Sequence, residues 1–141
     1  MTFVFRNGRE PHRNNVQLGQ FGRNRTNVWH YLGANSFANR SDEGNLLEIH
    51  PTVKPVQLVA DAIMDCSARG DIVIDSFLGS GTSVIAAERT GRRCYGLELD
   101  PLYVDATVRR WQNFTGEDAR HPSSGRTFNE LQSEKEEQDA D

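Results

Sequence analysis

The chain has 141 residues, 36% of them hydrophobic, so it is long enough for one domain with a modest core. No apolar run approaches the roughly 20 residues of a membrane-spanning helix, and the N-terminus lacks the apolar core of a secretory signal. We therefore expect a cytoplasmic protein without a membrane segment. The net charge of −4 hides an asymmetry: residues 1–40 hold six arginines and one acidic residue, whereas residues 41–141 hold ten basic and nineteen acidic residues. A basic arm on an acidic body suggests a polyanionic partner for the arm, although charge alone fits a solvated irregular segment equally well.

Residues 1–50 are rich in Asn, Arg and Gly and show little periodicity, so they predict loops with a short strand at residues 26–31. Because Val28 and Tyr31 accompany Trp29, we expect that indole to lie in the core rather than against a base. Apolar residues then recur at helical spacing over residues 54–68, which predicts a helix with Pro55 in its first turn.

The central part of the chain alternates between strand and helix patterns. Residues 71–75 and 93–98 read as buried strands, and residues 82–89 read as the helix between them. Asp100 is suited to cap a further helix that begins at Pro101. Strand, glycine loop, helix, strand and helix in this order predict a doubly wound α/β unit.

Two further features concern the organisation of the chain. Residues 117–141 are polar and acidic, which predicts a disordered tail. Two strands are few for a parallel sheet, so we expect an incomplete sheet that needs strands from residues 1–50, from a partner, or from a larger protein.

Cys66 and Cys94 stand far apart in apolar patterns and predict buried, reduced thiols without a zinc site.

The loop DSFLGSGT, from Asp75 to Thr82, is typical of a ligand-binding turn between a strand and a helix. A phosphate-gripping NTPase loop would need a lysine after its last glycine, and a dinucleotide fold would need a third glycine where this chain has Val84. Glu98, nineteen residues after Gly79, stands at the next strand end and is suited to ribose hydroxyls.

The charge of Asp75 favours one class of ligand for this loop. At about 6 Å and an effective dielectric near 20, a carboxylate contributes about 3 kcal/mol, which repels a pyrophosphate and attracts a cation. A helix N-terminus offsets part of the repulsion. A ligand with a ribose, a positive charge and no phosphate therefore fits best, and S-adenosylmethionine is such a ligand.

The runs HPTVKPVQLVADAIMDCS and DIVIDSFLGSGTSVIAAERTGRRCYGLELDPLYVDATVRRW resemble the C-terminal half of bacterial and phage DNA amino-methyltransferases, over residues 50–113. RNRTNVWHY, residues 23–31, resembles them more loosely. These enzymes methylate the exocyclic amino group of adenine (N6) or cytosine (N4) with S-adenosylmethionine. The resemblance implies a Rossmann-like methyltransferase fold and, with the charge argument, a set of cofactor-binding residues: Thr52, Lys54, Asp75, Phe77, Gly79, Gly81, Thr82 and Glu98. Ser76 stands where the family's DPFxGSGT loop usually has proline.

Catalysis in that family depends on a motif of the form [Asn/Asp/Ser]-Pro-Pro-[Tyr/Phe/Trp], which binds the flipped base. The nearest match is Asp100-Pro101-Leu102-Tyr103, and we interpret it as a helix cap. We therefore predict no catalytic residue in this chain and expect it to be inactive alone, with the catalytic part supplied by a missing N-terminal half or by a second copy.

The resemblance also implies three segments: the end of a target-recognition region at residues 1–49, a cofactor-binding core at 50–116, and the acidic tail at 117–141. Double-stranded DNA is the implied partner, with Arg23 and Arg25 near its phosphates. Two alternatives stay open: a degenerate module that binds DNA or a partner subunit, and a dinucleotide-binding domain.

Overall fold

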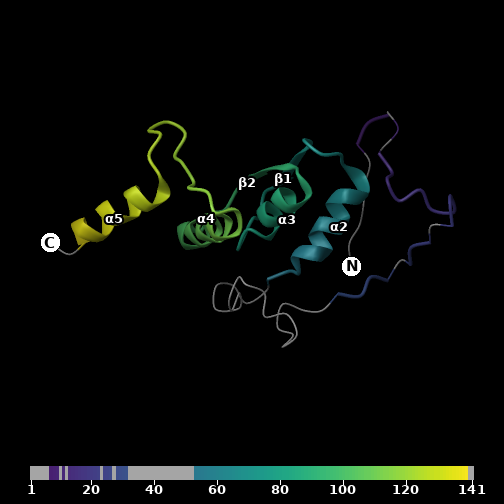
Figure 1. Ribbon diagram of the computed structural model, residues 1–141, viewed down its shortest axis with the longest axis horizontal. Helices are drawn as coiled ribbons and strands as arrows, with labels where there is room; N and C mark the ends of the chain where they lie inside the picture. The colour runs from purple at the N-terminus through teal and green to yellow at the C-terminus, as the bar shows by residue number, and fades with distance from the viewer. Residues whose placement is uncertain are drawn as a thin grey trace.

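The computed structural model describes residues 7–9, 11, 13–22, 24–26, 28–31 and 53–139. The elements follow in the order α2 (Val56–Cys66), β1 (Ile72–Asp75), α3 (Thr82–Thr90), β2 (Arg93–Gly96), α4 (Pro101–Thr115) and α5 (Phe128–Asp139) (Figure 1). The unit β1–α3–β2 is the predicted strand–helix–strand, so the fold is a Rossmann-like α/β unit with an incomplete sheet. None of the helices in these ranges combines the length and apolar character that a membrane span requires.

Strands β1 and β2 pair in parallel, with Ile72 opposite Arg93 and Asp75 opposite Gly96. The ladder extends past both strands, because the Leu97 amide donates to the Asp75 carbonyl at 2.9 Å and the Leu78 amide donates to the Leu97 carbonyl at 3.0 Å. Both strands therefore end at the same edge, and the segments that follow them lie side by side there.

Helix α3 packs against both strands and lies between α2 and α4 (Figure 1). Its core side contributes Ala86, which is fully buried and packs with Ala60 and Ile63 of α2. Ile85 of α3 is also only 1% exposed, and a side chain so buried contributes about 1.5–3 kcal/mol of hydrophobic free energy. This packing fixes α3, and with it the loop from which α3 begins.

The helix ends follow local sequence signals. The Asp100 side chain accepts a hydrogen bond from the Leu102 amide at 2.9 Å, and Pro101 occupies the first position of α4, as predicted. Gly91 ends α3 in the left-handed conformation, with φ at 71°. Helix α2 is shorter than the predicted range of residues 54–68, since it begins at Val56 and ends at Cys66.

One face of the sheet carries exposed apolar side chains. Ile72 is 53% exposed and Ile74 is 75% exposed, and Tyr95 beside them on β2 is 58% exposed. Val73, which points to the opposite face, packs against the core. Within the described residues, all packed helices therefore lie on one side of the sheet, whereas parallel sheets are normally covered on both faces.

The N-terminal segment differs from the prediction of a strand and a core indole. The described residues among 26–31 form no strand. Trp29 is 36% exposed, and its ring stacks under the guanidinium of Arg25, whose Cζ lies 3.8 Å from the ring centroid. The prediction of a core position for Trp29 was wrong, because a cation–π contact with Arg25 holds the indole at the surface and does not bury it.

The prediction of buried thiols was wrong for Cys66, and Cys94 is only partly buried. Cys66 is exposed, because it stands at the last turn of α2, where its thiol contacts the Ala62 carbonyl at 3.3 Å. Cys94 is half-buried on β2, and burial together with the charge of Asp75 raises the pKa of its thiol.

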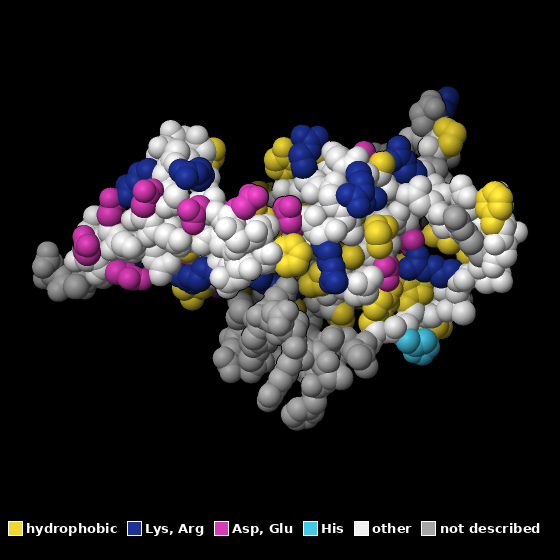
Figure 2. All heavy atoms as spheres, viewed as in Figure 1, with side chains coloured by type: hydrophobic (Ala, Val, Ile, Leu, Met, Phe, Trp, Pro, Cys, Tyr) yellow, Lys and Arg dark blue, Asp and Glu magenta, His cyan; other side chains and the backbone are white. Residues whose placement is uncertain are grey.

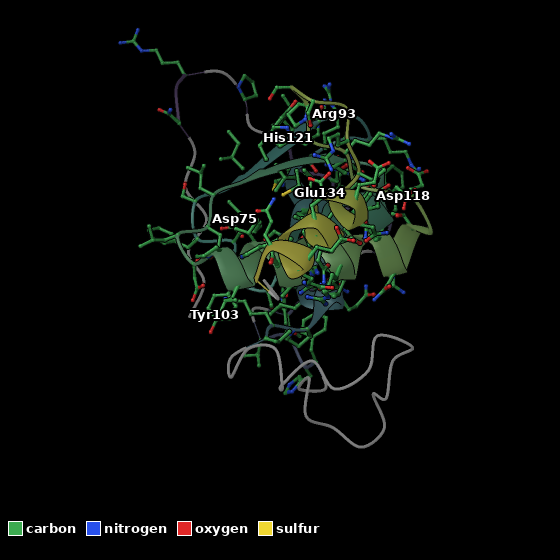
Figure 3. The ribbon with its side chains drawn as sticks, turned by 90° about the vertical axis from the view of Figure 1, so that its left-hand side faces the viewer. Asp75, Arg93, Tyr103, Asp118, His121 and Glu134 are labelled. Atoms are coloured by element: carbon green, nitrogen blue, oxygen red, sulfur yellow. The ribbon has the colours of Figure 1, made fainter. Side chains whose placement is uncertain are left out.

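The acidic tail, expected to be disordered, contains a hairpin and the helix α5. The Phe128 amide donates to the Ala119 carbonyl at 2.8 Å, and Arg120 bridges Thr127 in antiparallel fashion. Asp118 and His121 lie in the segment between α4 and α5, and Glu134 lies on α5 (Figure 3). The acidic side chains gather over this end of the molecule (Figure 2). Net charge pointed to disorder, but local capping stabilises a helix here.

Candidate functional site

The site is organised around the glycine loop between β1 and α3. Gly79 and Gly81 both adopt positive φ, 55° and 77°, a region that side chains other than glycine rarely occupy. A Cβ on Gly81 would also lie 2.5 Å from Cγ2 of Thr107 on α4. The two glycines therefore allow a tight turn and a close approach of α4 to the loop.

Asp75 joins the end of β1 to the first turn of α3. One of its carboxylate oxygens accepts the Phe77 amide at 3.0 Å, and the other accepts the Ser83 hydroxyl at 2.6 Å. The side chain is thus held in place at the strand end, with its charge beside the loop. The sequence pattern singled out Asp75 but not Ser83, its partner in the helix.

Glu98 fastens the loop from the side of β2. Its carboxylate accepts the Gly79 amide at 2.6 Å, and it also accepts the amides of Leu99 and Asp100 at 2.9 and 3.0 Å. Three backbone N–H groups thus converge on this one carboxylate. The structure therefore brings the acid predicted at the second strand end into direct contact with the glycine loop.

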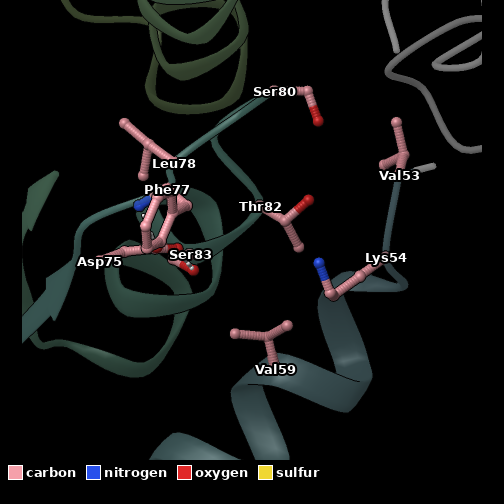
Figure 4. A pocket seen from close by; sticks show the side chains of 9 residues that line it. All are labelled: Val53, Lys54, Val59, Asp75, Phe77, Leu78, Ser80, Thr82 and Ser83. Atoms are coloured by element: carbon pink, nitrogen blue, oxygen red, sulfur yellow. Dashed lines mark hydrogen bonds between the residues drawn. The ribbon is translucent and has the colours of Figure 1, made fainter. Parts of the chain in front are cut away.

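A cavity of about 70 Å³ lies between the start of α2 and this loop. Its lining comes from two elements: Val53, Lys54 and Val59 on the α2 side, and Asp75, Phe77, Leu78, Ser80, Thr82 and Ser83 on the loop side (Figure 4). The structure thus brings Lys54, a residue 21 positions before Asp75, to the same hollow. Of the other predicted residues, Gly79, Gly81 and Glu98 do not line this cavity, and Thr52 falls outside the described residues.

The cavity is small for a ligand site, since small-molecule sites usually measure roughly 300–1,000 Å³. Phe77 is part of its wall, yet 91% of this residue is exposed. Because this part of the wall faces solvent, the hollow is an open depression rather than a closed pocket.

Both arginines predicted to meet DNA belong to the N-terminal segment. Arg25 forms an ion pair with Asp65 on α2 and stacks on Trp29, so its guanidinium helps to fasten this segment to α2. Tyr31 adds a second tie, because its hydroxyl donates to Asp61 at 2.7 Å. Arg23 falls outside the described residues.

Several residues of the site escaped sequence reasoning. Ser80 is a short hydroxyl residue inside the glycine motif and Ser83 follows the motif directly, so both could have been noticed from the sequence. Thr107 and Arg110 of α4 also contact the loop, but they follow Gly79 by 28 and 31 positions and carry no local signal.

Comparison with known proteins places these features in a class and then in a family. A parallel strand–glycine loop–helix–strand unit with an acidic residue after each strand is typical of nucleoside-binding α/β domains. The model of the N6/N4 DNA methylase family matches residues 4–109, and the chain belongs to this family.

Three proteins illustrate the similarity. The type II methyltransferase M.ScaI of Streptomyces caespitosus is 35% identical over 95 residues, which cover 67% of this chain and 31% of that protein. The orphan methyltransferase M.BamHII of Bacillus amyloliquefaciens is 33% identical over 103 residues, covering 73% and 37%. Among solved structures, the complex of M1.HpyAVI with SAM aligns with 33% identity and a TM-score of 0.42, covering 43% of this chain and 32% of that one. The chain therefore spans about a third of the length of these relatives.

Proposed function

We propose that this chain is the S-adenosylmethionine-binding part of a DNA methyltransferase that modifies the exocyclic amino group of adenine (N6) or cytosine (N4). The observation that carries the proposal is the cavity beside the glycine loop, where Lys54 and Asp75 line one hollow at the end of β1. Membership of the DNA methylase family supports the same reading. When bound, the cofactor supplies the methyl group.

The residues around the loop suit the chemical groups of this cofactor. The ammonium of Lys54, together with Thr52, would bind the methionine carboxylate. Asp75 would attract the positive end of the cofactor, and the exposed ring of Phe77 would contact the adenine. Glu98, preorganised by three backbone amides, would hold the ribose hydroxyls.

We further propose that transfer requires a second polypeptide region, either an N-terminal catalytic half or another copy of the chain. The sequence contains no base-binding motif of the family's form. The bare face of the sheet, with Ile72, Ile74 and Tyr95, offers an apolar surface on which additional elements would pack. Double-stranded DNA would approach the basic N-terminal segment with Arg23 and Arg25, although Asp65 already neutralises Arg25.

Calorimetry with S-adenosylhomocysteine tests the cofactor proposal. We expect the 141-residue chain to bind S-adenosylhomocysteine and not NAD. In Glu98→Gln an amide NH₂ replaces one carboxylate oxygen and faces backbone N–H groups that are themselves donors. We therefore expect the affinity for S-adenosylhomocysteine to fall about 10- to 100-fold. The exposed Glu117→Gln serves as the matched control and should bind as the wild-type chain does.

The alternatives predict different results in the same experiments. Binding of NAD instead would support a dinucleotide domain. Absence of cofactor binding, together with duplex-DNA binding that weakens steeply with salt, would support a non-enzymatic DNA-binding module. Transfer of labelled methyl groups to duplex DNA by the chain alone should stay at background, and robust transfer would contradict the proposed need for a second region.

A further inference from the structure

Two side chains of α4, Thr107 and Arg110, form hydrogen bonds with the glycine loop. The Thr107 hydroxyl donates to the Gly79 carbonyl at 3.1 Å. A guanidinium nitrogen of Arg110 donates to the Ser80 carbonyl at 3.1 Å and contacts the Thr82 hydroxyl at 3.3 Å. Three residues of the loop, Gly79, Ser80 and Thr82, are thus bonded to one helix.

The position of these two residues favours a specific role over incidental packing. Thr107 and Arg110 are three positions apart and so share one face of α4. They are only 7% and 4% exposed, and burial of an arginine is unfavourable unless its donors are used. The neighbouring Arg109, in contrast, is exposed and pairs with Asp105 on the same helix at 3.9 Å.

Thr107 and Arg110 bind the carbonyls of Gly79 and Ser80, which are not paired in the β1–β2 ladder. In a trans peptide the C=O and N–H point in opposite directions, so fixing the carbonyls of Gly79 and Ser80 also fixes the amides that follow them. The Gly79 amide is held by Glu98 and the Gly81 amide by the Leu78 carbonyl at 3.1 Å. With α4 attached, the carbonyls of Gly79 and Ser80 and the amides of Gly79 and Gly81 are all held by hydrogen bonds.

We propose that Thr107 and Arg110 are positioning residues that hold the glycine loop in its ligand-binding conformation. This inference rests on the proposed function for its consequence, since the loop would then be preorganised for S-adenosylmethionine. Neither residue lines the cavity, so each acts through the loop. A preorganised loop does not have to be ordered by the ligand, which favours binding.

Hydrogen exchange of the loop amides in the ligand-free chain tests this proposal without relying on cofactor binding. We expect Arg110→Met and Thr107→Val to speed exchange at the Gly79 and Gly81 amides by about tenfold or more, because each removes a buried hydrogen bond. Arg110→Lys and Thr107→Ser keep a donor and should restore part of the protection. Arg109→Met is the matched control and should leave the loop unchanged.

Circular dichroism identifies any variant that fails to fold. If Arg110→Met is unfolded, loop exchange in Thr107→Val tests the proposal instead. Unchanged loop exchange in a folded variant would overturn the proposal. Calorimetry with S-adenosylhomocysteine adds a second readout: affinity should fall about tenfold or more in Arg110→Met and not in Arg109→Met. If the wild-type chain binds no S-adenosylhomocysteine, the proposed function fails, while the exchange data still judge the role of Thr107 and Arg110.

Discussion

At the scale of single residues, Gly81 illustrates how the loop depends on the absence of a side chain. Its φ of 77° is unfavourable for other residues, and its α carbon faces Thr107, with only 2.5 Å between a built Cβ and the Thr107 Cγ2. Gly116, at the end of α4, has nearly the same φ of 75° but has no atom within 4 Å of a built Cβ. The two glycines therefore separate backbone strain from steric conflict.

We expect Gly81→Ala to destabilise the chain more than Gly116→Ala. Left-handed backbone strain costs roughly 1–2 kcal/mol at either position, and crowding against Thr107 adds roughly 1–3 kcal/mol at position 81 alone. Urea denaturation gives both free energies of unfolding. Equal losses in the two variants would show that α4 does not press on the loop.

The sequence predicted those site residues that stand next to a recognisable strand or glycine motif, and it did not predict those that are distant from the motif in sequence. Asp75 is the last residue of β1 and Glu98 lies two residues after β2, and parallel strands end at the same edge, so the proximity of both residues to the loop follows from the pattern. Arg110 could not be predicted, because its contact with Ser80 depends on how α4 packs against α3. The bonds by which Glu98 holds the loop also arise only from the folded geometry.

At the scale of elements, the same distinction separates the predictions that succeeded from those that failed. Helices and strands with capping or turn residues, such as α4 after Asp100, were predicted close to their observed bounds. The N-terminal segment was not, since it follows no repeating pattern: Tyr31 is held by Asp61 of α2, and Trp29 is held by Arg25 of its own segment. The tail was misjudged because charge was weighed above local capping.

The cap of α5 is a reciprocal pair between Thr127 and Glu130. The Thr127 amide donates to the Glu130 carboxylate at 2.8 Å, and the Glu130 amide donates to the Thr127 hydroxyl at 3.2 Å. This is the capping-box pattern, and it was present in the sequence as T-F-N-E. Hydrogen bonds from Thr127, first from its amide, lower the pKa of Glu130.

This lowered pKa predicts a pH dependence for α5. A carboxyl group whose pKa is lower in the folded state stabilises that state above its unfolded pKa and ceases to do so as the pH falls through its folded value. We therefore expect the first turn of α5 to fray on acidification, as measured by amide chemical shifts of residues 128–131.

Glu130→Ala should show the frayed shifts at neutral pH, and it should lose most of the acid-induced change. Glu137→Ala, near the other end of α5, is the control and should retain the pH response of the wild-type chain. An unchanged response in Glu130→Ala would mean that other groups govern this terminus.

At the scale of the whole molecule, the two-stranded sheet explains both what the chain offers and what it lacks. Its helices cover one face and position the glycine loop, beside which a small hollow lies at the end of β1. The other face, with Ile72, Ile74 and Tyr95, stays largely exposed in the described residues. The chain spans about a third of the length of the relatives it matches, and we propose that it binds the cofactor and that methyl transfer needs a further region.

Titration of the isotope-labelled chain with S-adenosylhomocysteine, followed residue by residue by NMR, tests the cofactor site most directly. We predict that the amide signals of residues 75–82 and of Glu98 shift saturably, while those of α5 do not. Saturable shifts confined to other parts of the chain, or none at all, would contradict the assignment of this loop as the cofactor site.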